Sequence, residues 1–206
     1  MKPPMDPVRV LVALACATTT AVSATAVAYG EQVTGATGVR GAAGVKGAAG
    51  CVAGERERRS DSAVDDGEIR WTSATKYDDA RTWAGKVWQT GSLSRIKIRP
   101  DSATTVNDLD WRDYSKADGK GAYYEHHGGV ADTDVIHLNR KSLDKPGKYA
   151  STELRRHVAA HELGHALGLC HKSEQVASLM WPAPLVTMPI TEPTDTDKAN
   201  YKKLWG

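Results

Sequence analysis

The chain has 206 residues, 40% of them hydrophobic and 25% charged, which is enough for one globular domain with flanking segments. Its 27 basic and 25 acidic residues give a formal net charge of +2, a balance too even for the basic surface of a nucleic-acid-binding protein. We therefore expect no nucleic-acid partner, and the charge balance names no other partner.

The first 28 residues are typical of a cleavable signal peptide. Basic residues precede an apolar run at 10–17, and small residues follow it. Because this run is shorter than the roughly 20 residues that span a bilayer, we expect no permanent membrane span. A lipid-attachment site at Cys16 is a weaker alternative, since Ala13 stands where such sites usually have Leu. We therefore expect a secreted, extracellular protein.

Residues 29–67 are predicted to form a disordered propeptide or linker. Glycine recurs at every third position from Gly35 to Gly50, which is the spacing of a collagen triple helix, but the run contains no proline. Without proline, and with so few triplets, a flexible spacer is favoured over a triple helix. The mixed charges at 55–61 have nothing to bury, which also favours disorder.

The pattern of a folded domain covers residues 68–206. Apolar residues at helical spacing from Ala80 to Trp88 predict a helix that ends near Gly91, and two aspartates precede it. Strands are predicted at the alternating or short apolar stretches 96–98, 122–124 and 135–138. The polar stretch 101–120 is predicted to be loop or weak strand.

Two further helices are predicted from their first residues. One begins near Ser151, a good N-cap, with Glu153 favouring the positive end of the helix dipole. The other begins at Thr194 and runs through Trp205, with Asp197 in the acidic position of a capping box. The domain is thus expected to have strands first, with helices between and after them.

The residues that carry chemistry lie at 161–171, where the sequence reads HELGHALGLCH. His161 and His165 share one helix face, one turn apart, so both imidazoles can bind one ion. Gly168 can adopt positive φ, which would end the helix and carry His171 towards the same ion. Three neutral imidazoles leave one tetrahedral position open, as in catalytic zinc sites. We therefore expect one catalytic zinc ion.

Glu162 is the candidate general base. It sits beside the first ligand, on the flank of the helix that faces the open position, where it can accept a proton from zinc-bound water and later return it to the leaving amine. The alternative is that the histidines are ordinary surface groups. His157 shares the helix face with His161, but a pairing of these two would have no Glu after its first His, so we expect His157 to lie behind the ligands or on the surface.

These residues resemble the metzincin zinc peptidases, and among them the matrixin-like branch. Residues 178–182, Ser-Leu-Met-Trp-Pro, follow His171 at about the distance of the family's Met-turn, so the resemblance assigns to Met180 the side chain that packs beneath the metal. The terminal Leu204-Trp205-Gly206 is similar to the end of the matrixin C-terminal helix. The resemblance implies an α+β metzincin-like domain, with a twisted mixed sheet packed on an active-site helix and a C-terminal helix.

The resemblance also implies where a substrate would bind. Ala122, Tyr123 and Tyr124 would belong to the edge strand that pairs with an extended peptide. The segment 182–186, including Pro182 and Leu185, would form the wall of the pocket for the side chain after the cut, and its apolar character suggests an apolar or aromatic preference.

The structural zinc and calcium pattern of the matrixins is not matched, so calcium is not indicated. Histidines and aspartates do occur in the corresponding region, and we expect them to be solvated loop and strand residues. They are His126, His127, Asp132, Asp134 and His137.

Two cysteines, Cys51 and Cys170, remain after removal of the signal, which permits one disulfide. Cys51 lacks the Pro-Arg-Cys-Gly setting of the matrixin cysteine switch, although its thiolate could still ligate the zinc. We favour a disulfide to Cys170, which would tie the linker to the chain just before the third ligand.

The leading hypothesis is a monomeric, secreted zinc-dependent endopeptidase that acts on peptides or proteins. A surface-associated binding protein with a vestigial zinc site is the alternative from another class, and the intact Glu162 weighs against it. An exopeptidase built on the same site is a third hypothesis.

Overall fold

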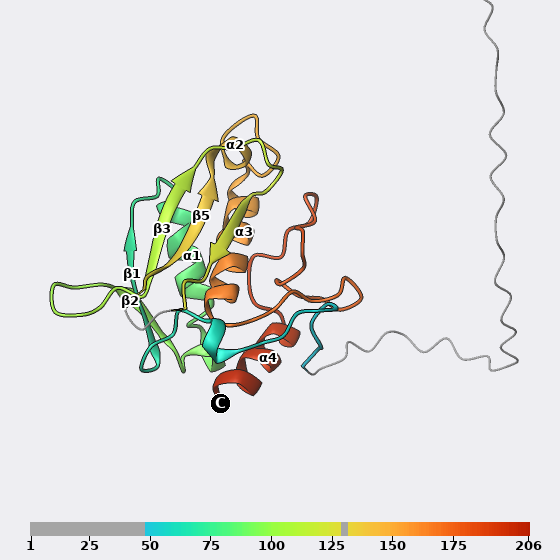
Figure 1. Cartoon of the computed structure of the whole chain (residues 1–206). Coiled ribbons are helices and arrows are strands. Elements are labelled where there is room, and N and C mark those ends of the chain that lie inside the picture. The colour runs from blue at the N-terminus through green and yellow to red at the C-terminus, as the bar shows by residue number, and fades with distance from the viewer. Residues whose placement is uncertain (1–47, 129–131) are drawn as a thin grey trace, which may run out of the picture. The chain divides into compact units, whose positions relative to one another are not determined.

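The computed structural model describes residues 48–128 and 132–206 (Figure 1). The predicted signal peptide and all but the end of the glycine-rich spacer lie outside the described residues. The strands are β1 (Glu68–Ser73), β2 (Lys97–Pro100), β3 (Leu109–Tyr114), β4 (Ala122–Glu125) and β5 (Asp134–Asn139). The helices are α1 (Asp78–Val87), α2 (Arg140–Leu143), α3 (Thr152–Ala166) and α4 (Asp195–Trp205), with 3-10 turns η1 (Arg59–Asp61) and η2 (Gly91–Leu93). Within this part of the chain, no helix is long and apolar enough to cross a membrane.

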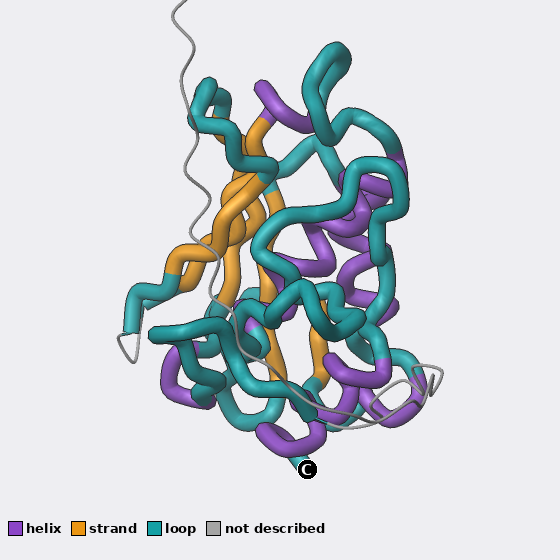
Figure 2. Tube along the Cα trace, turned by 90° about the vertical axis from the view of Figure 1, so that its right-hand side faces the viewer, coloured by secondary structure: helices purple, strands orange, loops and turns teal. Residues whose placement is uncertain are grey.

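The five strands form one mixed sheet in the order β2-β1-β3-β5-β4. Every neighbouring pair is parallel except β4 and β5, which are antiparallel. Strand β4 is therefore an edge strand. Helix α3 contacts α1, β4 and β5, and Figures 1 and 2 show the strands on one side and most helical turns on the other. The expected α+β architecture, a mixed sheet packed on the active-site helix with a C-terminal helix, is confirmed.

The core lies between the sheet and helices α1 and α3. Trp88, Trp111 and Leu163 come from different elements, and each is at most 2% exposed. The indole N–H of Trp88 donates to the carbonyl oxygen of Ala160 at 2.7 Å, which joins the end of α1 to the middle of α3. The helix that carries the histidine motif is therefore held against α1 and packs on the sheet.

Strand β3 occupies the centre of the sheet, although the sequence predicted only loop or weak strand there. Leu109 and Trp111 are its buried members, whereas Asp110 and Arg112 lie on the other face. The Asp110 carboxylate accepts hydrogen bonds from Thr72 and Asn107 on that face. One face of β3 is thus lined by polar side chains that pair with one another. The alternation of buried and polar residues in this strand is therefore hard to recognise within a sequence stretch that is polar throughout.

The predicted helix starts agree with the structure. The Ser151 side chain accepts a hydrogen bond from the backbone N–H of Leu154 at 3.2 Å, which caps α3. Thr194 and Asp197 form a complete capping box at the start of α4. Both caps are local interactions, which explains why sequence spacing alone located them.

Residues 48–67, which we call the N-terminal arm, differ from the predicted disordered linker. The backbone N–H of Ala63 donates to the carbonyl oxygen of Ala166 at 2.8 Å, and that of Arg58 donates to Gly168 at 3.1 Å. Figure 1 shows the arm, in cyan, passing the end of α3 beside α4. Contacts with residues far away in the sequence hold the arm, so the ordered domain begins before residue 68.

Candidate metal centre

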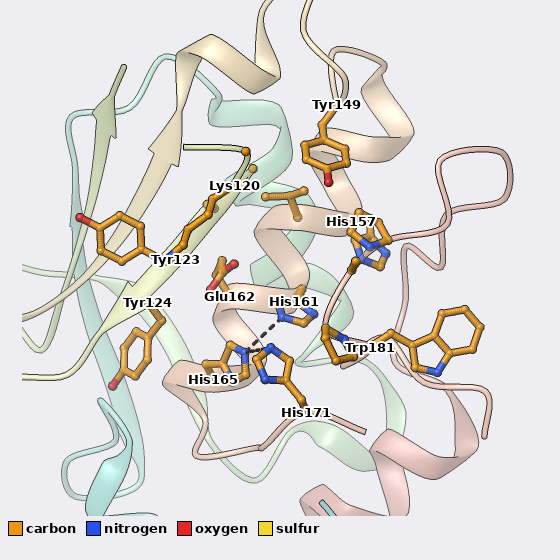
Figure 3. Close-up of a pocket in the computed structure, with 17 residues that line it drawn as sticks. Lys120, Tyr123, Tyr124, Tyr149, His157, His161, Glu162, His165, His171 and Trp181 are labelled. Atoms are coloured by element: carbon orange, nitrogen blue, oxygen red, sulfur yellow. Dashed lines mark hydrogen bonds between the residues drawn. The ribbon is translucent and has the colours of Figure 1, made fainter. Parts of the chain in front are cut away.

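Three histidines converge at the C-terminal end of α3. His161 and His165 project from the helix, and His171 comes from the loop that follows it (Figure 3). The Nε2 atom of His165 lies 3.1 Å from Nε2 of His161 and 3.2 Å from Nε2 of His171. Among the described residues, these three form the one group of His, Cys, Asp and Glu side chains spaced to hold a metal ion.

The hydrogen bonds made by the Nδ1 atoms determine whether the Nε2 atoms can bind a metal ion. Nδ1 of His161 lies 2.9 Å from the carbonyl oxygen of Leu179, and Nδ1 of His165 lies 2.8 Å from that of Leu169. A carbonyl oxygen only accepts, so each Nδ1 carries the hydrogen and each neutral ring presents a lone pair at Nε2. Such lone pairs repel one another, and a cation placed between them removes the repulsion. The donor set therefore fits zinc.

His171 has a different partner. Its Nδ1 lies 2.9 Å from Oε1 of Glu55, and its backbone N–H donates to Oε2 of the same carboxylate at 2.8 Å. Although burial raises the pKa of Glu55, its hydrogen bonds and electrostatic interaction with His171 outweigh this effect and lower that pKa. Sequence reasoning missed Glu55, because 116 residues separate it from His171 and nothing in the local pattern relates them.

Burial sets the protonation of the other groups. It lowers the pKa of His161 well below its usual range and that of His165 to about 4, so both rings are neutral and able to bind a metal. Burial raises the pKa of Glu162 to about 8, and this side chain is only 7% exposed. A cation bound beside Glu162 would favour its carboxylate form.

The turn after α3 is made by Gly168, as the sequence predicted. Its φ is +81°, in the left-handed region that suits glycine. A Cβ built at this position would lie less than 3.0 Å from the carbonyl oxygen of Arg58 in the N-terminal arm. The turn therefore requires glycine for its backbone angle and for the close approach of the arm.

A cleft of about 380 Å³ opens between β4 and α3 beside the three histidines. Of the predicted substrate-binding residues, four line it: Ala122, Tyr123, Tyr124 and Pro182. Leu185 does not line this cleft and is 48% exposed. Glu162 faces the cleft between β4 and the histidines (Figure 3).

The family model described as Matrixin matches residues 43–206. The chain belongs to the matrixin family. Matrix metalloproteinase-19 of Mus musculus is 35% identical over 89 residues, which are 43% of this matrixin and 16% of the relative. A solved structure described as the GM1 bound form of the ECX AB5 holotoxin is 16% identical, with a TM-score of 0.47 over 66% of this chain and 79% of that one. This structural likeness is too low to support an inference. Matrixins use zinc, and the histidine cluster of this one could bind it.

Met180 of this matrixin is fully buried against α3. A Cβ added at Gly164 would collide with its side chain, so the sulfur packs directly on the helix that carries two of the histidines. The Asp197 carboxylate accepts the backbone N–H of Leu179 at 2.8 Å, which anchors this segment to α4. The place of Met180 agrees with a packing role.

His157 lies behind the histidine cluster rather than within it. Its ring stacks beside that of His161 at 6.0 Å between centroids, and the residue is 1% exposed. Its Nδ1 donates to the carbonyl oxygen of Ile190 at 2.6 Å. His157 therefore supports the loop after Met180 and does not approach the other two histidines as a ligand.

The cysteines Cys51 and Cys170 form a disulfide, with 2.09 Å between the sulfur atoms. This is the pairing that we favoured from the sequence over zinc ligation by Cys51. Since the bond involves the residue immediately before His171, it joins the N-terminal arm to the loop that carries the third histidine. A thiol from Cys51 is thus not a metal ligand in this structure.

The remaining histidines form separate contacts. Nδ1 of His126 lies 3.0 Å from Asp134, and Nε2 of His137 lies 2.8 Å from Glu125. Asp134 is only 3% exposed, so the expectation of a solvated residue is wrong for it; Tyr124 and the backbone of His127 also donate to its carboxylate. Asp132 is exposed, as expected.

Proposed function

We propose that this matrixin is a secreted zinc-dependent endopeptidase, with His161, His165 and His171 as the zinc ligands and Glu162 as the general base. The observation that carries the proposal is the convergence of imidazole nitrogens, two of them with free lone pairs, beside a buried carboxylate in a cleft. A vestigial site would have no need to keep Glu162 buried in that position.

The chemistry divides between the ion and the protein. Zinc, when bound, supplies Lewis acidity that acidifies a water molecule and polarises the scissile carbonyl. Glu162 accepts the proton of the attacking water and then donates it to the leaving amine.

The cleft favours an endopeptidase over an exopeptidase. A second cavity of about 530 Å³, lined by Tyr124, His165 and His171, continues on the side of the N-terminal arm. The cleft therefore extends to both sides of the metal centre, and an extended peptide could pair with the free edge of β4 along it. Pro182 and the neighbouring apolar residues would favour an apolar or aromatic side chain after the cut.

Export is supported by two features of the sequence and structure. The first 28 residues have the order of a cleavable signal, and the Cys51–Cys170 disulfide fits an oxidising compartment. A secreted enzyme would act on extracellular proteins or peptides. Mass spectrometry of the exported protein would report its N-terminus and the disulfide together.

The Glu162→Gln variant tests the mechanism. We expect it to keep one zinc ion per chain and to lose about 10²- to 10⁴-fold in casein hydrolysis, the usual contribution of general-base catalysis. Chelation of the wild type should abolish turnover, and zinc should restore it. Full activity in the variant would contradict the role of Glu162, and zinc binding without turnover in the wild type would favour the binding-protein alternative. End-group analysis of the products separates internal from terminal cleavage.

A further inference from the structure

The N-terminal arm is attached to residues 167–172. We call this segment the ligand loop because it contains His171. The backbone N–H of Val52 donates to the carbonyl oxygen of His171 at 3.0 Å, and Cys51 is bonded to Cys170. The arm therefore contacts the backbone of the third histidine and is bonded to the side chain of the residue before it.

Within this attachment, Glu55 makes the closest approach to the metal centre. One oxygen of its carboxylate contacts the ring Nδ1 of His171, and the other accepts the backbone N–H of the same residue. The two contacts fix the ring and the main chain of His171 together. The other two histidines have only neutral carbonyl oxygens as partners, so Glu55 supplies the one carboxylate hydrogen-bonded to a ring of the cluster among the described residues.

A second acidic residue of the arm holds it in place. The Glu57 carboxylate lies 2.6 Å from the ammonium group of Lys172, which is 0% exposed. A buried ammonium group needs a paired carboxylate, because an unpaired charge in the interior is strongly destabilising. Glu55 and Glu57 thus bind two consecutive residues of the ligand loop, and the Lys172 pair holds the arm two residues after Glu55.

We propose that Glu55 is a positioning residue for the third zinc ligand, so that the N-terminal arm is part of the metal centre. This inference rests on the proposed function in one respect, namely that His171 holds zinc. A carboxylate that accepts the Nδ1 hydrogen fixes the tautomer with its lone pair at Nε2, orients the ring and makes it a stronger ligand. Its negative charge also partly offsets that of a divalent ion held by neutral imidazoles.

The test compares zinc affinity in the full chain and in three variants. Glu55→Gln removes the charge, Glu55→Ala removes the whole contact, and Glu174→Gln is the matched control. Glu174 is an exposed carboxylate three residues after His171, and it makes no hydrogen bond or ion pair with the described part of the chain. Zinc affinity is measured by competition with a chromophoric chelator, and the ligand environment by the visible spectrum of the cobalt-substituted protein.

We expect both Glu55 variants to bind zinc about 10- to 100-fold more weakly than the wild type, with an altered cobalt spectrum. Glu174→Gln should bind zinc within about twofold of the wild type and keep its spectrum. The Tm of the metal-free protein and the count of free thiols show whether each variant retains its fold and disulfide. An altered cobalt spectrum in a variant with unchanged Tm is a result that a merely structural role would not give.

Wild-type affinity and spectrum in both Glu55 variants would overturn the proposal, and so would an equal loss of affinity in Glu174→Gln. The readout is independent of turnover, so the two proposals fail separately. A wild type that binds zinc without cleaving peptides contradicts only the proposed function. A wild type that cleaves peptides while Glu55→Gln keeps full zinc affinity contradicts only the role of Glu55, and a wild type without zinc affinity contradicts both.

Discussion

Replacing Gly168 with alanine should destabilise the turn that carries His171 to the metal centre. The φ of +81° at this position is unfavourable for a residue with a Cβ. The added methyl group would also lie within 3.0 Å of the Arg58 carbonyl oxygen. This oxygen belongs to backbone, so the N-terminal arm has to move and lose the hydrogen bond from Arg58 N–H to Gly168.

The magnitude follows from these two effects. A non-glycine residue in the left-handed region costs about 1–2 kcal/mol. Loss of one backbone hydrogen bond costs about 0.5–1.5 kcal/mol. The free energy of unfolding should therefore fall by about 1.5–3.5 kcal/mol. Gly67→Ala is the matched control, because Gly67 has a φ of +78° but no atom within 4 Å of an added Cβ, so only the first cost applies.

Equilibrium denaturation of the metal-free chain, with its disulfide intact, measures both variants. We expect Gly168→Ala to lose about 1 kcal/mol more than Gly67→Ala, the size of one hydrogen bond. Gly168→Ala should also bind zinc more weakly, whereas Gly67→Ala should not. Equal destabilisation by the two substitutions would refute the argument that the arm constrains this turn.

Two further variants test other features of the fold. Removing the disulfide with Cys51→Ser and Cys170→Ser should lower the free energy of unfolding by about 2–5 kcal/mol, because a separation of 119 residues corresponds to a loop-closure entropy of about 5 kcal/mol. Denaturant unfolding measures this loss. A loss of less than about 1 kcal/mol would contradict the prediction. Burial raises the pKa of Asp108 to about 6, so the folded state favours the protonated form and this contribution to stability is lost as the pH rises through about 6. Asp108→Asn should therefore raise the free energy of unfolding by roughly 1 kcal/mol more at pH 8 than at pH 4, once screening at a partly exposed carboxyl is allowed for. An equal change at both pH values would show that the carboxyl does not titrate this way.

The parts of the fold and site that sequence reasoning predicted depend on near neighbours in the chain. His161 and His165 converge because a helix has 3.6 residues per turn, and Gly168 turns the chain because it lacks a Cβ. The caps at Ser151 and Thr194 are likewise made within four residues. Such interactions leave a pattern in any sequence window that contains them.

The parts that it missed depend on partners far away in the sequence. Glu55 looks like one of several solvated charges in the sequence, and only the fold brings it to His171. Strand β3 was obscured because its polar residues pair with Thr72 and Asn107 across an exposed sheet face. Leu185 was placed in the pocket wall by family resemblance, but in the fold it lies at the surface and is 48% exposed.

The covalent link between the N-terminal arm and the ligand loop limits how this chain can be shortened. A backbone cut anywhere between Cys51 and β1 would leave the arm fragment attached through Cys170. A recombinant protein that started at residue 68 would instead expose the Cys170 thiol and leave the Lys172 ammonium group without its carboxylate. Expression of the matrixin domain should therefore start before Cys51, and a single proteolytic cut downstream of it would nick the chain without releasing a peptide.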